Sequence, residues 1–476
     1  MPQRPNIVFI LTDQMRGDCL SAAGHPVIRT PTLDMFARQG TLFTRAYASV
    51  PSCIAARACM WTGQSASTTG RLGYRDAVPW RYPVTLMSEL ASGGYQCHCV
   101  GKTHFYPQGS LMGFHSMETY EASQNHDGDY VNDHWKWVSE LTDGRLHEFD
   151  HGLPSNSWAA RPSTLPEELH NNTWVGKKSI EFLQRRDPKK PFFLNMSFHR
   201  PHAPLDPPQV FFDMYRDRDV PPPPVGDWAH VHDAPVNNLN AWQGRLPAAT
   251  LARSRRAYYA QVAHIDSQIG RVMRALERMK AGPTAFIFTA DHGEMLGDHC
   301  LFRKCYAYEG SAGVPLVVAL PGERRGAFCD APIALEDLYP TMLEIAGAPV
   351  PERTEGLSLL PLCTRKTAGP WRQFVHGEHS ASYSEDEAMQ YLTDGKTKYI
   401  WFTKSGREQL FDLQTDPQEL HDMAADPGAG ELLALWRGRL IERLAARPQD
   451  RLTDGRKLFP GTLLPAVRPE LLEPEH

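Results

Sequence analysis

The run Asn6-Ile7-Val8-Phe9-Ile10-Leu11-Thr12-Asp13-Gln14 sets the pattern from which the fold of this chain is predicted. Its five consecutive apolar residues, 7–11, are bounded by polar ones, which is typical of a strand buried on both faces of a parallel sheet. Similar apolar runs, also interpreted as buried parallel strands, lie at residues 95–100, 192–198, 285–289 and 315–320. Helical patterns separate the runs, so we predict an α/β fold in which helices sandwich a large, mixed, mostly parallel sheet.

Between these runs the sequence contains one clear helix and two irregular segments. The helix covers about residues 252–280 and places an apolar side chain every three or four positions along one face. Residues 106–170 and 203–250 lack such periodicity. They are predicted to be long loops that build the walls of a binding site and select its ligand.

The pattern changes after about residue 370. Short strand patterns joined by turns, at residues 373–379, 389–393, 398–403 and 408–413, predict an antiparallel meander. A helix at about residues 430–447 and an extended tail follow. We therefore predict an α/β domain of residues 1–370 and a smaller domain of residues 371–476 that combines an antiparallel sheet with a helix.

The composition argues against large polyanionic partners. Fifty Lys and Arg face 55 Asp and Glu, giving a formal net charge of −5, so neither nucleic acid nor an anionic membrane is expected as a partner. The sequence contains no secretory leader and no apolar stretch of the roughly 20 residues that span a bilayer. We therefore expect a cytoplasmic protein whose nine cysteines are mostly reduced thiols. A homo-oligomer is compatible with this composition.

Polar and charged side chains follow four of the predicted strands at the points where the strands end. Ligands of parallel α/β sheets bind beyond the carboxyl ends of the strands, so these side chains are expected to meet at one edge. Any one of them alone is as well explained by a solvated loop residue or a buried structural histidine. Four such strand ends together predict a functional site. The residues are Asp13 and Gln14, Lys102 and His104, His199 to His202, and Asp291 and His292.

Two of these strand ends carry the donor atoms of a metal site. Asp13, Gln14 and Asp291 supply oxygen atoms, and His292 supplies one imidazole. Carboxylate and amide oxygens suit a hard divalent cation such as Ca²⁺ or Mg²⁺, and the imidazole also suits Mn²⁺. The sequence therefore predicts one divalent metal at this edge of the sheet.

Residues 51–63, Pro-Ser-Cys-Ile-Ala-Ala-Arg-Ala-Cys-Met-Trp-Thr-Gly, contain a candidate nucleophile. The small residues after Cys53 favour a helix that begins there, and a helix N-terminus stabilises an anionic group such as a thiolate. Arg57 lies four residues further on and hence on the same helical face, where it would hold the nucleophile or an anionic substrate. The competing interpretation of Cys53 is a buried structural cysteine.

An ordered series of motifs resembles the type I sulfatases of the alkaline phosphatase superfamily. Cys53-Ile54-Ala55-Ala56-Arg57 fits the Cys-x-Pro/Ala-x-Arg core of that family, whose cysteine a maturation enzyme oxidises to Cα-formylglycine. The resemblance covers most of the chain. It implies an alkaline-phosphatase-like fold, one divalent metal with Ca²⁺ as the first choice, and a formylglycine-generating enzyme as a partner. Further matches, in chain order, are Pro5-Asn6-Ile7 with Asp13, Gly101-Lys102-Thr103-His104, Pro201-His202, Asp291-His292-Gly293-Glu294, Lys304 before Tyr308-Glu309-Gly310, and Gln409-Leu410-Phe411-Asp412-Leu413.

The same resemblance implies hydrolysis of a sulfate monoester of an aryl or carbohydrate alcohol through a covalent sulfo-enzyme. Cys53, as the hydrated aldehyde, would be both nucleophile and metal ligand, and Arg57 would help to lower the pKa of its hydroxyl. The second hydroxyl then allows the aldehyde to reform and to expel sulfate without attack of water on sulfur.

Further roles follow from the resemblance for the strand-end side chains. Lys102 and Lys304 would neutralise the sulfate oxygens. His202, with Lys304, would protonate the departing oxygen, and His104 would accept the proton of the second hydroxyl. Candidate substrate-binding residues are His199, Arg200, Arg303 and Glu309.

Three departures from the commonest sulfatase pattern leave other functions open. Gln14 stands where many members have a second Asp, His292 where many have Asn, and Ala55-Ala56 where Pro-Ser is commoner. The Asp-Gln and Asp-His pairs also resemble the phosphonate monoester hydrolase and choline sulfatase branches. One alternative is therefore a hydrolase of phosphonate monoesters or phosphodiesters. Another is a non-catalytic binding protein on the same scaffold, with an unmodified Cys53.

Overall fold

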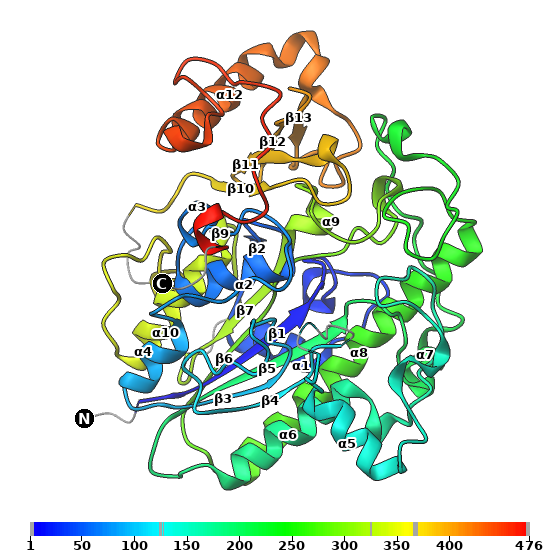
Figure 1. Cartoon of the computed structure of the whole chain (residues 1–476), viewed down its shortest axis with the longest axis vertical. Helices are drawn as coiled ribbons and strands as arrows, with labels where there is room; N and C mark the ends of the chain where they lie inside the picture. Colours follow the sequence, from blue (N-terminus) through cyan, green and yellow to red (C-terminus); the bar gives the residue numbers. More distant parts are fainter. Residues whose placement is uncertain (1–3, 123–125, 127, 324–325, 365–369, 473–476) are drawn as a thin grey trace.

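One large sheet with helices on both faces forms most of the molecule (Figure 1). The computed structural model describes residues 4–122, 126, 128–323, 326–364 and 370–472. Within them the strand order is β4-β3-β5-β1-β6-β7-β2-β8, with β9 also paired to β2. Every residue of the central strand β1 is buried, which confirms the predicted mixed sheet covered on two faces. The strands are β1 (Asn6–Asp13), β2 (Thr41–Tyr47), β3 (Gln96–Gly101), β4 (Ser116–Thr119), β5 (Phe192–Pro201), β6 (Thr284–Ala290), β7 (Gly313–Ala319), β8 (Ala327–Cys329) and β9 (Ile333–Ala334).

The last of the five predicted parallel strands is antiparallel. β7 pairs antiparallel with both β6 and β2, whereas the pairs from β4 through β3, β5 and β1 to β6 are parallel. The prediction of its direction was wrong because an apolar run reports burial on two faces and not the direction of the strand. As a result, the amino end of β7 lies at the edge where the parallel strands end. The carboxyl end of β2, a strand absent from the sequence-based prediction, lies there too.

Helices cover the two faces of the sheet in separate groups (Figure 1). One face carries α1 (Pro31–Gln39), α6 (Asn171–Arg185) and α8 (Ala248–Arg278), and the other carries α2 (Cys53–Thr62), α4 (Leu86–Ser92) and α10 (Leu338–Ala346). The longest helix, α8, begins and ends slightly earlier than predicted. Its apolar stripe from Tyr258 to Leu276 is buried, and the helix packs on β5 and α6.

The two segments predicted to be long loops contain short helices. They hold α5 (Asp133–Thr142), η2 (Glu148–His151), η3 (Glu167–Leu169), α7 (Gln209–Tyr215) and η4 (Ala229–His232); residues 123–125 and 127 lie outside the described residues. The other short elements of this unit are η1 (Ser21–Ala23), α3 (Ala66–Thr69), η5 (Asp298–Cys300), α9 (Glu309–Ala312), η6 (Leu335–Asp337) and α11 (Leu360–Thr364). In the part of the chain that the structure describes, no helix combines the length and the apolar character needed to cross a membrane.

A separate antiparallel sheet of four strands, in the order β10-β11-β12-β13, follows along the chain. Its strands are β10 (Val375–His379), β11 (Met389–Thr393), β12 (Thr397–Phe402) and β13 (Glu408–Asp412). Helix α12 (Gly430–Ala445) packs Trp436 and Leu440 in one apolar cluster with Leu392 and Trp401 of the sheet. The predicted domain boundary between residues 370 and 371 stays a prediction. The short helices here are η7 (Glu385–Glu387), η8 (Met423–Ala425), η9 (Pro427–Ala429), η10 (Pro448–Asp450) and η11 (Pro469–Leu471).

The extended tail folds back onto the unit that contains the large sheet. The backbone N–H groups of Leu72 and Gly73 donate to the carbonyl of Ala466, and the N–H of Arg468 donates to the carbonyl of Gly70. Val467 between them is buried. The tail therefore ties the two units together beside α3; residues 473–476 lie outside the described residues.

Breaking the buried ion pair of Glu378 and Arg447 is expected to cost about 3 kcal/mol near neutral pH and much less in acid. Two N–O contacts of 2.7 and 2.8 Å join the side chains. Burial raises the pKa of Glu378, but Arg447 outweighs it and lowers that pKa from 4.5 to about 2. Because the pKa is lower in the folded protein, the carboxylate stabilises the fold above about pH 4.5 and loses this contribution as the pH falls toward 2.

The measurement is the difference in melting temperature between the wild type and Glu378→Gln, taken near pH 7 and again near pH 3. The difference is expected to shrink in acid. Equal differences at the two pH values would contradict the prediction.

Candidate active site

The predicted strand-end residues meet at one edge of the large sheet, around a cavity of about 350 Å³. β3 and β5 supply Lys102 and His202, and the carboxyl end of β2 leads into α2, which begins at Cys53. Because β7 is antiparallel to β6, the connection 291–312 stays at this edge and brings Lys304 to the cavity. The cavity is lined by Cys53, Tyr74, Asp76, Lys102, Ala122, Ser155, Asn156, His199, His202, Arg303, Lys304, Cys305, Ser382 and Tyr383.

Cys53 is the first residue of α2, as predicted, and its side chain is buried. Its Sγ lies 3.1 Å from Nε2 of His292, 3.3 Å from Nζ of Lys304 and 3.6 Å from Oδ1 of Asp13. Burial and Asp13 raise the pKa of the thiol. The neighbouring cations, Lys102 first among them, outweigh both and hold that pKa well below its usual range. The site therefore stabilises negative charge at position 53.

Four buried side chains, Asp13, Cys53, Asp291 and His292, form a cluster whose ligand atoms lie within 4.8 Å of one another. Nδ1 of His292 donates to the carbonyl of Gly293 at 2.8 Å, which leaves Nε2 facing the other three side chains. Burial and then Asp13 raise the pKa of Asp291. Burial lowers the pKa of His292, but Asp291 and the thiol outweigh it and raise that pKa to about 9. Two carboxylates, a thiol and an imidazole that converge in this way provide the mixed oxygen and nitrogen donors that fit a divalent cation.

Gln14 borders this cluster with its side chain turned to other partners. Its backbone N–H donates to Oδ1 of Asp291 at 3.1 Å, and its amide oxygen accepts from Nζ of Lys304 at 2.8 Å. The amide nitrogen donates to the carboxylate of Glu294, which closes the motif Asp291-His292-Gly293-Glu294 and had been given no role from the sequence. Ligation of a metal by Gln14 stays a prediction.

Arg57 is fully buried and supports the carboxylates of the cluster. Its Nε lies 2.9 Å from Oδ2 of Asp291, and its Nη2 lies 3.7 Å from Oδ2 of Asp13. Nη1 donates to the carbonyl of Lys102 at 2.9 Å and to the hydroxyl of Ser197 at 3.0 Å. The guanidinium does not line the cavity. The geometry therefore gives Arg57 a positioning role, whereas the sequence had predicted a contact with the nucleophile or the substrate.

The two lysines of the cavity differ in their partners. Nζ of Lys102 lies 2.6 Å from Oδ2 of Asp13, an ion pair that compensates one carboxylate of the cluster. Nζ of Lys304 contacts Gln14, Cys53 and, at 3.0 Å, Nε2 of His202. Among the described residues, no carboxylate forms an ion pair with Lys304. Its charge is therefore available to an anion in the cavity.

His104 is held in place by two acidic side chains that the sequence did not point to. Its Nε2 lies 3.3 Å from Oδ1 of Asp76, and its backbone N–H donates to the carboxylate of Glu121 at 3.1 Å. Burial and Lys102 lower the pKa of His104, but its hydrogen bond to Asp76 and the nearby thiol of Cys53 outweigh them and raise it. The imidazole therefore sits between a carboxylate and the candidate nucleophile, where a proton acceptor is required.

His202 is neutral in the observed arrangement. Its Nδ1 donates to the carbonyl of Ala203 at 2.7 Å, so its Nε2 accepts from the ammonium of Lys304. Burial and Lys304 lower the pKa of His202 well below its usual range. The proton of this pair thus resides on Lys304, which refines the expectation that His202 itself carries it.

Of the four predicted substrate-binding residues, His199 and Arg303 line the cavity and Arg200 does not. The guanidinium of Arg200 is buried, with Nε and Nη2 at 2.7 and 2.9 Å from the two carboxylate oxygens of Asp206. Successive side chains of a strand point to opposite faces, so only one of the neighbours His199 and Arg200 can face the cavity. The prediction that Arg200 contacts the substrate was therefore wrong, because its guanidinium forms an internal ion pair. Nη1 of Arg200 also lies 2.7 Å from Nδ1 of His199.

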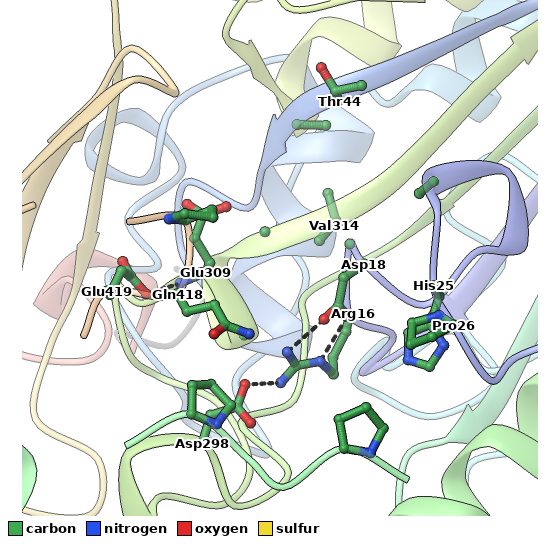
Figure 2. Close-up of a pocket in the computed structure, with 18 of the residues that line it drawn as sticks. Arg16, Asp18, His25, Pro26, Thr44, Asp298, Glu309, Val314, Gln418 and Glu419 are labelled. Atoms are coloured by element: carbon green, nitrogen blue, oxygen red, sulfur yellow. Dashed lines mark hydrogen bonds and ion pairs between the residues drawn. The ribbon is translucent and has the colours of Figure 1, made fainter. Parts of the chain in front are cut away.

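Glu309 lies in a different cavity, of about 430 Å³, which Figure 2 shows. Its carboxylate is 2.8 Å from Nζ of Lys398 on β12, and its backbone N–H donates to Glu419 at 2.8 Å. Glu309 is therefore part of an ion pair that joins the two units, because α9 points it toward the small sheet and away from the catalytic cavity. Other charged side chains of this cavity are also paired: Arg16 lies between Asp18 and Asp298 (Figure 2), and Glu419 contacts Lys398.

Several residues of the catalytic cavity went unrecognised in the sequence, among them two pairs from segments without a predicted role. Tyr74 and Asp76 lie in an irregular segment between α3 and α4, and Ser382 and Tyr383 follow β10 in the smaller unit. None of them occupies a predicted strand end or a motif, and no spacing in the sequence marks them. The smaller unit thus completes the wall of a cavity whose chemistry belongs to the larger one.

The site is typical of a hydrolase that acts on anionic esters. It combines a buried nucleophile, a cluster of cation ligands and lysines that face a common cavity. Family comparison specifies this class. The family model described as Sulfatase matches residues 5–348, and the model described as N-sulphoglucosamine sulphohydrolase, C-terminal, matches residues 297–446. The chain belongs to the sulfatase family.

Individual relatives agree with this assignment. An arylsulfatase from Clostridium perfringens (strain 13 / Type A) is 43% identical over 475 residues, which cover 96% of this chain and 98% of the relative. The phosphonate monoester hydrolase of Agrobacterium radiobacter matches with a TM-score of 0.79 and 25% identity over 94% of this chain and 96% of that one. A structure in complex with its substrate D-glucosamine-2-N,6-O-disulfate shares the fold, with a TM-score of 0.77 and 22% identity over 96% and 100% of the chains. The chain is a sulfuric ester hydrolase with the predicted alkaline-phosphatase-like fold.

Proposed function

We propose that this hydrolase acts on sulfate monoesters of aryl or saccharide alcohols, with residue 53 present as formylglycine and one Ca²⁺ in the cluster. The position of Cys53 carries the proposal. Its Sγ lies between 3.1 and 3.6 Å from an imidazole, an ammonium and a carboxylate, so nucleophile, cation site and sulfate-binding charge meet at one atom. A formylglycine-generating enzyme is the partner that this modification requires, and we place both proteins in the cytoplasm.

The residues of the cluster would hold the cation. Asp13, Asp291, Nε2 of His292 and the oxygen that replaces Sγ at residue 53 are its proposed ligands, with the amide oxygen of Gln14 as the further one predicted from the sequence. A bound divalent cation supplies positive charge that stabilises sulfate oxygens and lowers the pKa of a hydroxyl at residue 53. The oxygen donors of this set suit Ca²⁺ or Mg²⁺ and the single imidazole also suits Mn²⁺; Ca²⁺ is the first choice because the chain resembles the sulfatases that use it.

The protein's own side chains bind the sulfate and move protons. Lys102 and Lys304 line the cavity and would neutralise the sulfate oxygens. Nζ of Lys304 holds a proton 3.0 Å from Nε2 of His202, and this pair would protonate the departing alcohol oxygen. His104, positioned by Asp76 at 3.3 Å, would accept the proton that must leave residue 53 when sulfate is released.

The cavity wall suits a small ring as the alcohol half of the ester. Tyr74 and Tyr383 supply aromatic faces, and Ser155, Asn156 and Ser382 supply hydrogen-bonding groups. An aromatic face stacks on an aryl ring or on the apolar face of a sugar, while hydroxyl and amide groups bind ring substituents. About 350 Å³ accommodates one such ring together with the sulfate group.

Hydrolysis of phosphonate monoesters or phosphodiesters is the second candidate. The structural likeness to a phosphonate monoester hydrolase favours it, as do the Asp-Gln and Asp-His pairs of the sequence. Sulfate and phosphonate esters both present a tetrahedral anionic group, so the same nucleophile and cations would serve either reaction.

Comparison of aryl sulfate and aryl phosphonate turnover tests the proposal. The chain is produced together with a formylglycine-generating enzyme, and the peptide that contains residue 53 is analysed by mass spectrometry. We expect the –CH2–SH group of residue 53 to be converted to an aldehyde, with sulfur replaced by oxygen and two hydrogens lost, and faster hydrolysis of 4-nitrophenyl sulfate than of 4-nitrophenyl phenylphosphonate. Faster phosphonate hydrolysis would support the second candidate. Absence of both activities in fully modified protein would support a non-catalytic scaffold.

A further inference from the structure

Arg303 is a second cation of the catalytic cavity that pairs with no carboxylate in the part of the chain that the structure describes. It lies in the connection between β6 and β7, directly before Lys304, and lines the cavity. Its Nη2 donates to the carbonyl of Asn240. Its Nε is buried and has no hydrogen-bond partner among the described residues, and no carboxylate of those residues forms an ion pair with its guanidinium. A buried N–H donor without a partner is unfavourable unless a ligand satisfies it.

The guanidinium of Arg303 is held in a fixed orientation. Its backbone has a φ of 68°, in the left-handed region that an arginine rarely adopts, and its N–H donates to the carboxylate of Glu294 at 2.5 Å. The guanidinium lies over the ring of Tyr383, 5.5 Å from its centroid. Tyr383 in turn stacks on Trp242, with 5.9 Å between the ring centroids and 13° between the ring planes. Backbone and side chain are thus both anchored, although no structural ion pair requires the charge.

The balance of charges in the cavity indicates what Arg303 binds. The carboxylates of the cluster are compensated by Lys102 and Arg57, at 2.6 and 2.9 Å, and Asp76 is engaged by His104 at 3.3 Å. Lys304 and Arg303 remain. Lys304 contacts the nucleophile at 3.3 Å and serves the sulfate that is transferred, so a simple sulfate monoester leaves the charge of Arg303 without a counterpart.

We propose that Arg303 and Tyr383 form a subsite for a second anionic group, a carboxylate or a second sulfate, on the alcohol half of the substrate. The inference rests on the proposed function, since it assumes that the cavity binds a sulfate ester beside Lys304. A guanidinium presents several N–H donors in one plane and binds planar or tetrahedral oxyanions through charge-assisted hydrogen bonds. The tyrosine ring, next to it, supports the ring that carries the anionic group.

A matched pair of substrates tests this subsite. The pair is 4-(sulfooxy)benzoate and its methyl ester, which differ by one negative charge at the same position; 1,4-phenylene bis-sulfate distinguishes a second sulfate from a carboxylate. For each protein, kcat/KM is measured for 4-(sulfooxy)benzoate and for its methyl ester, and the first value is divided by the second. In Arg303→Gln this ratio is expected to fall about tenfold relative to the wild type. Arg303→Lys keeps the charge without the planar fork and is expected to give an intermediate ratio.

Arg216→Gln is the matched control, because Arg216 is an exposed arginine paired with Asp213 outside the cavity, and its ratio should equal that of the wild type. An unchanged ratio in a folded Arg303→Gln, or in Arg303→Lys if the glutamine variant does not fold, would overturn the subsite. Failure of the wild type, with residue 53 modified, to hydrolyse either member of the pair would instead overturn the proposed function, so the two failures are distinguishable.

Discussion

Replacement of Cys53 by alanine is expected to lower kcat for an aryl sulfate by more than about 10⁴-fold, because it removes the nucleophile and one ligand of the cation. The fold should survive. Cys53 is followed by Ile54-Ala55-Ala56 in a helix, where alanine has the highest intrinsic propensity, and the side chain that is lost is small. Turnover and the melting temperature of Cys53→Ala, both compared with the wild type, check the two parts of the prediction.

Cys59→Ala provides the control within the same helix. Cys59 is equally buried, but it belongs to an apolar cluster with Val50, Ala55 and Leu72 and takes no part in the cation cluster. This substitution also removes one thiol from the same helix. Turnover by Cys59→Ala should nevertheless stay within a small factor of the wild type. Sustained turnover by Cys53→Ala, or an equal loss in Cys59→Ala, would contradict the assignment of the nucleophile.

Cys53→Ser separates attack on sulfur from release of sulfate. A serine hydroxyl in this position still faces the imidazole and ammonium that lie within 3.1 and 3.3 Å of Sγ. It has no second hydroxyl on the same carbon, however, so a sulfate that it accepts cannot be expelled by formation of an aldehyde. We therefore expect a protein that becomes sulfated once at residue 53 and then stops, which mass spectrometry of the corresponding peptide detects.

The central part of the fold was predictable because its strands are mainly apolar and buried. Five of the nine strands described in the large sheet, β1 and β7 among them, coincide with the predicted apolar runs, although polar residues interrupt the runs of β3 and β5. β2 could not be found in this way, since polar residues interrupt its sequence Thr-Leu-Phe-Thr-Arg-Ala-Tyr, with an exposed threonine and a half-buried arginine at Thr44 and Arg45. The missing strand matters, because β2 is the element that delivers Cys53 to the catalytic edge.

The cation cluster was predictable from strand ends, whereas the outer wall of the cavity was not. Asp13, Asp291 and His292 directly follow buried strands, so topology alone brings them together. Arg200 occupies an equally suggestive position but faces the interior, because strand alternation decides its direction and a one-residue difference reverses it. Tyr383 comes from the other unit, and its arrival at the cavity depends on how the two units pack, a property that no local pattern encodes.

Removal of the divalent cation is expected to lower turnover by more than about 10³-fold and to lower the melting temperature as well. The effect on rate follows because the positive charge that stabilises the sulfate oxygens is lost, and such a charge contributes several kcal/mol. The effect on stability follows because Asp13 and Asp291 remain buried beside each other with less compensation. Dialysis against a chelator, with elemental analysis of the product, followed by addition of Ca²⁺, Mg²⁺ or Mn²⁺ separately, measures both effects.

Comparison of Asp291→Asn with Asp298→Asn shows whether these effects come from loss of the cation or from loss of a buried ion pair. Both aspartates are buried and bound by arginine, Asp291 by Arg57 at 2.9 Å and Asp298 by Arg16 at 2.7 Å, but only Asp291 belongs to the cation cluster. Both variants should be less stable than the wild type, because each leaves a buried arginine with a weaker partner. Only Asp291→Asn should also weaken cation binding, by at least about 100-fold.

The response to chelator then separates a cation-binding carboxylate from a merely structural one. A ligand that binds only the folded protein raises its melting temperature, and its removal lowers it. Asp298→Asn should start from a lower melting temperature and still lose stability in chelator, as the wild type does. Asp291→Asn should start low and change little, since the cation is already absent. If chelator lowers the melting temperature of Asp291→Asn as much as that of the wild type, the stabilising cation binds somewhere other than the cluster beside Cys53.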